Sequence, residues 1–320
     1  MRNDGTILTA CFVLLLAAPL PAKEFGFDYQ RIVTTGPEAE VSLSYLSGNL
    51  TVIGGDEDDV IIDARKRIDA VNMDEAQIAA DHVEIKVDQR EERVEIAANY
   101  LRMRNRSQSF WKKVLGTGGQ DSYGEVDWTI RVPRHCRLSV VNTSGRIEIS
   151  HLIGTVEVRS SASEVFLTSI EGSIRVENST GAVIGELLFG PLDIRQVAGR
   201  IDLKFLEGDV RIKSSTADIS VSQDNGSLDL TTASGNVDIQ TNLDSSRDYF
   251  VATESGHIHL MIPETSSGNL RIESQTGDIK TEIPITIKSM SHKQVEGTFG
   301  FGGVKINLTS VSGDVTVAQF

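Results

Sequence analysis

Six acidic residues recur at the polar positions of a long segment in which apolar and polar residues alternate: Glu148, Glu157, Asp193, Asp202, Asp229 and Asp238. Glycoside hydrolysis needs a carboxylate pair about 5–10 Å apart in a cleft. Stacked strands bring many acids this close without any catalytic purpose, and such acids are typical of a solvated face. The polar positions also vary from repeat to repeat, so none is marked as special. We therefore expect no catalytic residue, with a carbohydrate-active enzyme as the alternative.

Two further sets of residues are candidates for metal or thiol chemistry. His257 and His259 place two imidazoles on one face of a strand, but a zinc site needs a third ligand, and no residue at a matching spacing follows. The nine-residue calcium-binding repeat needs Gly-Gly-x-Gly-x-Asp, which is absent. Cys136 starts a strand and has no second cysteine beside it, so we expect a buried, inert thiol. No metal and no cofactor are predicted.

A basic segment stands out in this acidic protein. It combines five cations with two adjacent aromatic residues: Arg102, Arg104, Arg106, Phe110, Trp111, Lys112 and Lys113. Cations beside an aromatic wedge suit anionic lipid headgroups or an acidic glycan. The other interpretation is a solvated insertion with Trp111 folded onto the end of the domain. We expect an interaction loop here.

Composition limits the partners of the chain. It has 320 residues, with 31 Lys and Arg against 45 Asp and Glu, so its net charge is −14. Nucleic-acid binding needs a basic face that neutralises phosphates, and this balance excludes it. Apolar residues make up 39% and charged residues 24%, which is ordinary for a folded protein.

The elements that must position these residues follow a nine-residue repeat. Small residues, nearly all glycine, recur at this step: Gly145, Gly154, Ser163, Gly172, Gly181, Gly190, Gly199, Gly208, Ala217, Gly226 and Gly235. Two and four places after each of them lies an apolar residue, with Gly185 as the exception. Alternation of this kind predicts a strand with one buried face, and the glycine predicts a turn.

A second period makes the repeating unit 18 residues long instead of nine. Two places before each small residue, small and large side chains alternate, as in Thr143, Leu152, Ser161 and Ile170. Two unlike corners per unit predict coils of roughly 18 residues and two strands, stacked about 4.8 Å apart. The predicted fold is an all-β, β-solenoid domain, like a single-stranded β-helix. An antiparallel sandwich is the rival architecture.

The N-terminal region is less regular. Ser47–Ile53 shows the repeat motif once, and Asn72-Met73-Asp74-Glu75 resembles a capping box that opens a short helix to about Ala80. Residues 82–87 and 93–97 predict a strand pair. Longer loops are expected at 242–249 and 286–301, the latter as a mobile excursion or an end cap.

These features resemble the bacterial putative-adhesin domain family, a domain family of unknown function. The resemblance rests on Val126–Pro133, Leu138–Val140 and Ser144–Ile149: a strand that ends in Val-Pro leads into repeated Ser-Gly turns. It implies an extracytoplasmic β-solenoid without established catalytic residues.

The start of the chain predicts a targeting signal. The apolar run 7–18 is too short to span a bilayer and is followed by prolines and a small residue, Ala22. We therefore expect a signal peptide at 1–22, with a retained anchor as the alternative. A β-rich region with one short helix should follow at 23–128, and the solenoid at 129–320.

The expected function is a non-catalytic, extracytoplasmic adhesin-like protein, that is, an envelope scaffold or interaction protein. Its partner would be an envelope component, a surface glycan or another protein, with peripheral contact to anionic lipid. A glycan-binding protein or a carbohydrate-active enzyme of the cell envelope is the alternative.

Overall fold

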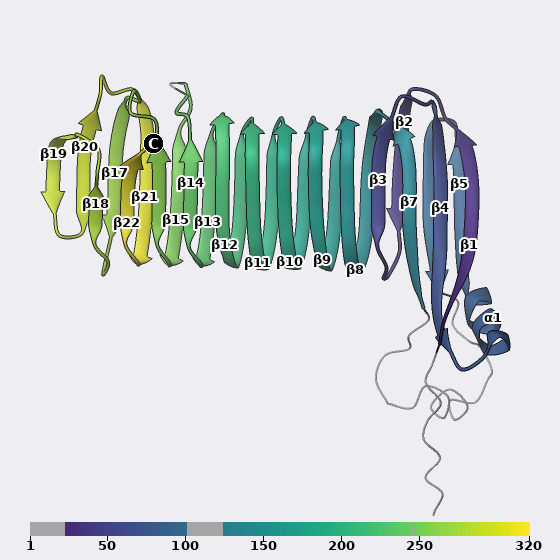
Figure 1. The fold of residues 1–320 in the computed structure, drawn as a ribbon. Coiled ribbons are helices and arrows are strands. Elements are labelled where there is room, and N and C mark those ends of the chain that lie inside the picture. Colours follow the sequence, from purple (N-terminus) through teal and green to yellow (C-terminus); the bar gives the residue numbers. More distant parts are fainter. Residues whose placement is uncertain (1–22, 101–123, 245) are drawn as a thin grey trace, which may run out of the picture.

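The chain forms a rod of stacked β-coils with a helix at one end (Figure 1). The structure is a computed structural model that describes residues 23–100, 124–244 and 246–320. The expected signal peptide at 1–22 and the basic segment at 102–113 lie outside the described residues. Among those described, no helix is long and apolar enough to cross a membrane.

Five long strands make up the middle of the rod: β8 (His135–Ile153), β9 (Val156–Glu171), β10 (Ile174–Phe189), β11 (Leu192–Glu207) and β12 (Val210–Asn225). Each pairs in parallel with the next, and the partners lie 18 residues apart, as in Val158, Val176 and Ile194. The parallel ladder confirms the all-β solenoid and its 18-residue coil, and it excludes the antiparallel sandwich.

The two corners of each coil differ. At one corner the strand bends but keeps its pairing, so that Gly181 still lies opposite Gly199. At the other corner the strand ends, beside Gly172, Gly190 and Gly208. Each coil is therefore one long bent strand whose two halves belong to facing sheets. We call the first kind the continuous corner and the second the interrupted corner.

The apolar residues of the repeat fill the space between the two halves. Ile174, Ile194 and Ile201 have exposed fractions of 2%, 0% and 0%. The glycine exception in the repeat has a packing reason. A Cβ atom at Gly185 would lie 2.8 Å from side-chain atoms of both Leu188 and Leu203, so these leucines occupy its place.

A row of buried polar side chains, not predicted from the sequence, lines the continuous corner. The row stands three residues before each corner residue and includes Asn142, Asn178 and Gln196, all at most 5% exposed. The Asn178 amide donates to the Ser163 carbonyl at 2.9 Å, and the Gln196 amide donates to the Gly181 carbonyl at 2.7 Å. The row therefore satisfies backbone carbonyls that the bend would otherwise leave buried without a partner.

The ladder begins before residue 129. Strands β2 (Glu38–Ser44) and β3 (Leu50–Gly55) form a first coil that pairs in parallel with the two halves of β8. The single repeat motif at Ser47–Ile53 thus belongs to the stack, which crosses the division expected at residue 128. The sequence between these strands and β8 is a long insertion.

That insertion, together with the preceding strand β1, extends both sheets at the N-terminal end. One sheet continues from β2 to β6 (Arg93–Tyr100) and β5 (Val83–Arg90). The other continues from β3 to three further strands, in the order β7 (Glu125–Pro133), β4 (Asp59–Ala70) and β1 (Lys23–Thr34). The expected strand pair at 82–87 and 93–97 is confirmed as β5 and β6.

The single helix in the described part of the chain, α1 (Met73–Asp81), packs against β4, β5 and β1. The Asn72 side chain accepts a hydrogen bond from the Glu75 amide at 2.9 Å, as the capping box predicts. Ala76 and Ala80 are buried in a small cluster with Ile68 of β4. The helix therefore covers apolar surface at the N-terminal end of the rod.

The C-terminal end does not follow chain order. Two coils, β13 (Leu228–Ser234) with β14 (Val237–Thr241) and β15 (Tyr249–Ser255) with β16 (Ile258–Ile262), continue the stack. The last coil in sequence, β21 (Val304–Ser312) and β22 (Val315–Gln319), lies next to β15 and β16. The earlier β17 (Gly268–Ser274) and β18 (Ile279–Thr281) lie outside it.

The segment expected as a mobile excursion or an end cap is an ordered hairpin. Strands β19 (Thr286–Ser291) and β20 (Gln294–Phe299) pair with each other, and β20 pairs with β17. The end-cap interpretation is therefore the one that the structure supports.

The inward and outward positions should differ sharply in their effect on stability. We expect Ile201→Asp to lower the free energy of unfolding by several kcal/mol, because an unpaired carboxylate would be buried between the sheets. Ile201 is 0% exposed. Glu148→Ala on the outer face should cost less than about 0.5 kcal/mol. Urea unfolding of both variants measures this, and equal losses would contradict the assigned faces.

Corner glycines should be required for two reasons at once. Gly199 has φ of +134°, and a Cβ atom there would lie 1.9 Å from the Gly181 carbonyl oxygen of the preceding coil. Gly199→Ala should therefore destabilise the protein by about 2 kcal/mol or more in urea unfolding. Gly55→Ala is the matched control, because its added methyl group would meet no atom within 4 Å. A stable Gly199→Ala protein would show that the coils are not stacked this closely.

Candidate functional site

The six acids singled out from the sequence lie on the outer faces of the stack, and each faces a cation or a histidine. Arg146 contacts Glu148 and Arg159 contacts Glu157, both at 2.5 Å, and Arg211 contacts Asp229 at 3.1 Å. The remaining three pairs are Arg195–Asp193 at 3.6 Å, Lys204–Asp202 at 3.8 Å and His259–Asp238 at 3.5 Å. The sheet faces are thus lattices of alternating charge.

One further acid of the lattice, Glu177, has the opposite electrostatics from a carboxylic acid that acts as a proton donor. Glu177 accepts hydrogen bonds from Arg175 and also lies 3.4 Å from Arg159. The Arg175 hydrogen bond, with the neighbouring cations, lowers the pKa of Glu177 below its ordinary value. A general acid of a glycosidase needs a raised pKa instead. The ion pairs of Glu177 therefore favour its ionised form.

The two histidines do not converge on a common point. His257 lies 3.5 Å from Asp314, whose amide donates to His257 Nδ1 at 3.0 Å. His259 instead lies 3.5 Å from Asp238. Within the described ranges, no three His, Cys, Asp or Glu side chains gather into a group that could hold a metal ion.

Cys136 is buried, as its position in the sequence predicts. Its exposed fraction is 3%, and it forms no disulfide. Burial raises the pKa of its thiol to about 12, so the reactive thiolate is disfavoured near neutral pH. Together these observations fit an inert packing role.

A groove of about 530 Å³ runs across several coils beside the continuous corners. Cationic side chains line it at equivalent positions, namely Arg159, Arg195 and Lys213, and so do exposed corner serines such as Ser161 and Ser179. Lys213 forms no ion pair with any described residue, whereas Arg159 and Arg195 also face acids. The sequence signal that was missed is this 18-residue row of cations, interrupted once by Glu177.

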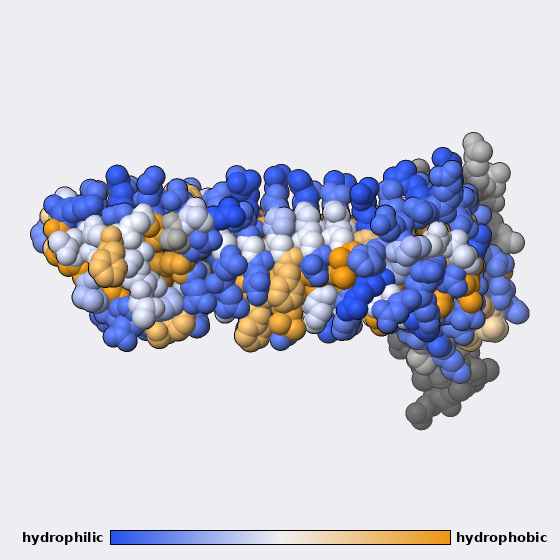
Figure 2. All heavy atoms as spheres, turned by 90° about the horizontal axis from the view of Figure 1, so that it is seen from above, coloured by the Kyte–Doolittle hydropathy of each residue, from blue (hydrophilic) through white to orange (hydrophobic). Residues whose placement is uncertain are grey.

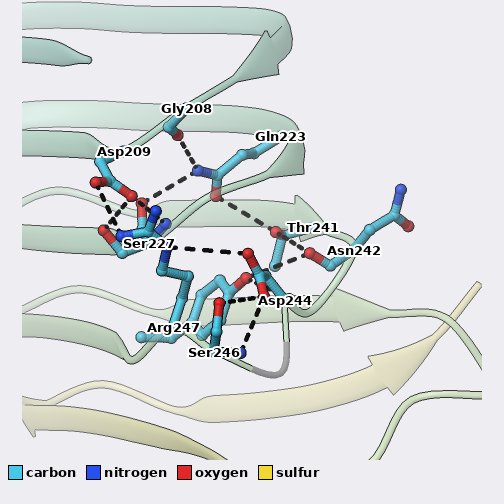
Figure 3. A network of polar contacts seen from close by, with 10 residues as sticks. Gly208, Asp209, Gln223, Ser227, Thr241, Asn242, Asp244, Ser246 and Arg247 are labelled. Carbon is cyan, nitrogen blue, oxygen red and sulfur yellow. Dashed lines mark hydrogen bonds and ion pairs between the residues drawn. The ribbon is translucent and has the colours of Figure 1, made fainter. Parts of the chain in front are cut away.

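The expected loop at 242–249 is tied to the stack by a polar network (Figure 3). Arg247 contacts Asp209 at 3.3 Å across the coils, and Asp209 accepts hydrogen bonds of 2.9 Å from both the amide and the hydroxyl of Ser227. Within the loop, Asp244 accepts from the Ser246 amide at 2.9 Å. The network anchors the loop and stabilises the charge of both carboxylates.

Acidification should weaken the contacts that Asp209 makes with Ser227 and Arg247. The Ser227 amide hydrogen bond, with Arg247 nearby, holds the pKa of Asp209 below its ordinary value. A lowered folded-state pKa adds stability above the unfolded pKa of about 3.9, and this stability is lost as the pH falls through the folded pKa. We expect Asp209→Asn to be less stable at pH 7 and to lose less on acidification below about pH 4.

Urea unfolding from pH 7 down to about pH 2.5 measures this difference. Asp224→Asn is the control, because its carboxylate forms no ion pair or hydrogen bond with the described residues. Parallel pH curves for the Asp209 variant and the unaltered protein would contradict the role of the network.

This chain is similar to one protein family and to several solved structures. A model of the family Toastrack DUF4097 matches residues 62–318. No curated protein matches the chain. Similar solved structures include a putative cell adhesion protein from Clostridium sporogenes, with 10% identity and a TM-score of 0.22, covering 92% of this chain and 100% of that chain. A putative adhesin from Bacteroides fragilis shares 12% identity with a TM-score of 0.34, covering 93% of this chain and 97% of that chain.

The family assignment rests on the extent of the sequence match. The match at 62–318 begins within β4 and ends within β22, so it spans all five long strands and nearly all of the C-terminal coils. This match confirms the resemblance to an adhesin-domain family of unknown function, and the chain belongs to the Toastrack family DUF4097.

Proposed function

We propose that this protein is a non-catalytic, extracytoplasmic interaction protein of the cell envelope, adhesin-like in that it presents extended surfaces to a partner. The observation that carries the proposal is the charge lattice. All six candidate acids are paired with a neighbouring cation or histidine. Catalysis needs carboxylates whose environments push their pKa values apart, whereas paired acids on a rigid face suit recognition and solubility.

The extracytoplasmic location is supported by the sequence of the first residues. An apolar run at 7–18 precedes prolines and Ala22, as in a cleaved signal peptide. Cleavage after Ala22 would release a chain that begins with an ordered strand. Cys136 would then be the only cysteine, so the cleaved chain could form no internal disulfide.

The basic segment is proposed as one contact element. Its five cations and its neighbouring Phe110 and Trp111 suit anionic lipid headgroups or an acidic surface glycan. In sequence it lies between β6 and β7, two strands at the N-terminal end of the rod.

Glycan binding is the second candidate, and the groove at the continuous corners favours it. Arg159, Arg195 and Lys213 supply positive charge, and the corner serines supply hydroxyl groups. Guanidinium and hydroxyl groups bind carboxylates and sugar hydroxyls through hydrogen bonds. A linear acidic polysaccharide would lie along the stack and meet these groups coil after coil.

The test begins with the secreted protein. We expect the N-terminus of protein recovered from the periplasm or the medium to lie near Lys23. This protein should be retained by vesicles that contain anionic lipid or by a polyuronate, with no release of products. Replacing the cations at 102–113 with Glu should abolish vesicle retention, because it reverses the charge of the contact.

Two further variants distinguish binding in the groove from binding through the basic segment. Lys213→Glu should weaken retention by the polyuronate alone, and Lys305→Glu, on β21 away from the groove, should change neither. Turnover of a polysaccharide that disappears when one outward Asp or Glu is replaced, with the fold intact, would overturn the proposal. So would a cytosolic product that retains Met1.

A further inference from the structure

An apolar patch lies on the surface of the stack where the long strands end. Leu187, Phe189 and Phe205 lie at neighbouring interrupted corners, with exposed fractions of 39%, 39% and 52%. Figure 2 looks down on the side where β9–β12 end and shows apolar residues over the middle of the rod, among hydrophilic neighbours. We call these three residues the corner patch.

The backbone does not explain why large side chains stand there. Leu187 and Phe205 have φ of +57° and +55°, a left-handed conformation that Gly or Asn adopts at lower energy. The equivalent residues of the two preceding coils, His151 and Ser169, share the conformation without being large and apolar. Bulky apolar groups held in a strained and exposed position point to a use outside the fold.

The register places Leu187 beside Phe205 and puts Phe189 close to them along the chain. Glu186 pairs with Lys204 and Leu188 with Leu206, so Leu187 and Phe205, which lie between these pairs, are neighbours on adjacent coils. Leu188 and Leu206 are each 2% exposed and anchor the corner from within. Phe189 follows two residues after Leu187 on the same strand.

Carboxylates surround the patch, and they differ from those on the sheet faces. Phe189 lies in register between Glu171 of the preceding coil and Glu207 of the following one. Glu171, Glu186 and Glu207 are exposed and form no ion pair with any residue that the structure describes. Lys204, the cation beside them, contacts Asp202 at 3.8 Å. The patch is therefore apolar with an uncompensated negative rim.

This combination selects one kind of partner. A cation placed over the Phe189 ring would be attracted by the ring face and by the carboxylates on both sides. An adjacent apolar side chain would be buried against Leu187 and Phe205. The negative rim would repel anionic lipid and acidic glycans, the ligands proposed for the basic surfaces of this chain.

We propose that the corner patch binds a polypeptide segment in which an aromatic or aliphatic side chain stands beside Lys or Arg. The proposal rests on the assignment of the chain as an interaction protein and adds a second surface with the opposite charge preference. The rod would then bind two kinds of partner. Its basic surfaces would bind anionic envelope ligands, and the corner patch in the middle of the stack would bind a basic polypeptide.

A synthetic peptide with the sequence of residues 102–113 is a suitable probe, because it combines five cations with Phe110 and Trp111. We expect saturable binding to the protein by fluorescence anisotropy of the labelled peptide. The double variants Phe189→Ser/Phe205→Ser and Glu171→Gln/Glu207→Gln should each weaken binding by about tenfold or more. A peptide with Ser in place of both aromatic residues should also bind more weakly.

Matched controls separate the patch from the general negative charge. Phe250→Ser removes an exposed aromatic residue on β15, and Glu254→Gln/Glu264→Gln removes the same charge elsewhere. Both control proteins should bind the peptide like the unaltered chain, and circular dichroism should report the same fold for all variants. Equal weakening by the controls, or no weakening by the patch variants, would overturn the proposal.

The same variants are tested with anionic vesicles and the polyuronate. Retention should persist when the corner patch is altered. If the unaltered protein binds neither anionic ligand but binds the peptide through the patch, the proposed anionic partners are wrong and the patch is upheld. Vesicle binding that is lost in Phe189→Ser/Phe205→Ser would instead assign the patch to lipid and overturn the inference.

Discussion

In-register parallel pairing every 18 residues is the constraint on which the rest of this structure depends. Each side chain lies about 4.8 Å from the side chain one coil away, so residues are selected as rows along the rod. The close approach of Gly199 to the Gly181 carbonyl shows the constraint in the backbone. The amide of Gln196, which bonds the same carbonyl, shows it in the buried polar row.

The same constraint explains why the sheet faces carry lattices of charge. Like charges in register would repel at this spacing, whereas acids and bases that alternate along and between strands stabilise each other slightly. Arg159 illustrates this, because it contacts Glu157 on its own strand and Glu177 on the next. A repetitive lattice offers many equivalent contacts but no unique catalytic pair. Distinct chemistry arises where a row is broken, as at Lys213 in the groove and at Leu187 and Phe205 on the interrupted corner.

A stack of this kind also leaves strand edges at its ends, and the chain manages them differently at the two ends. At the N-terminal end β6 and β7 first extend the sheets in parallel, and the outer strands β5, β4 and β1 then pair antiparallel. Helix α1 packs beside these outer strands. At the C-terminal end the hairpin of β19 and β20 extends one sheet. Strand β19 is short, and its pairing shifts between Ile287 and Ser289, leaving Lys288 out of register. A short, irregular edge strand that carries a lysine resists addition of further strands.

The sequence by itself determined the repeating unit of this protein. The nine-residue step identified the corner residues and the buried faces, because inward residues at positions such as Ile174 and Ile201 must be apolar in every coil. The capping box at Asn72 located the helix, because capping depends on residues close in sequence. Only the tertiary structure decided that β2 and β3 pair with β8 across a long insertion, and that β21 and β22 lie inside β17 and β18. It also decided which cation faces each acid and where the corner patch lies. These features depend on contacts between segments far apart in the chain. The local periodicity of the sequence does not specify which coils lie next to each other.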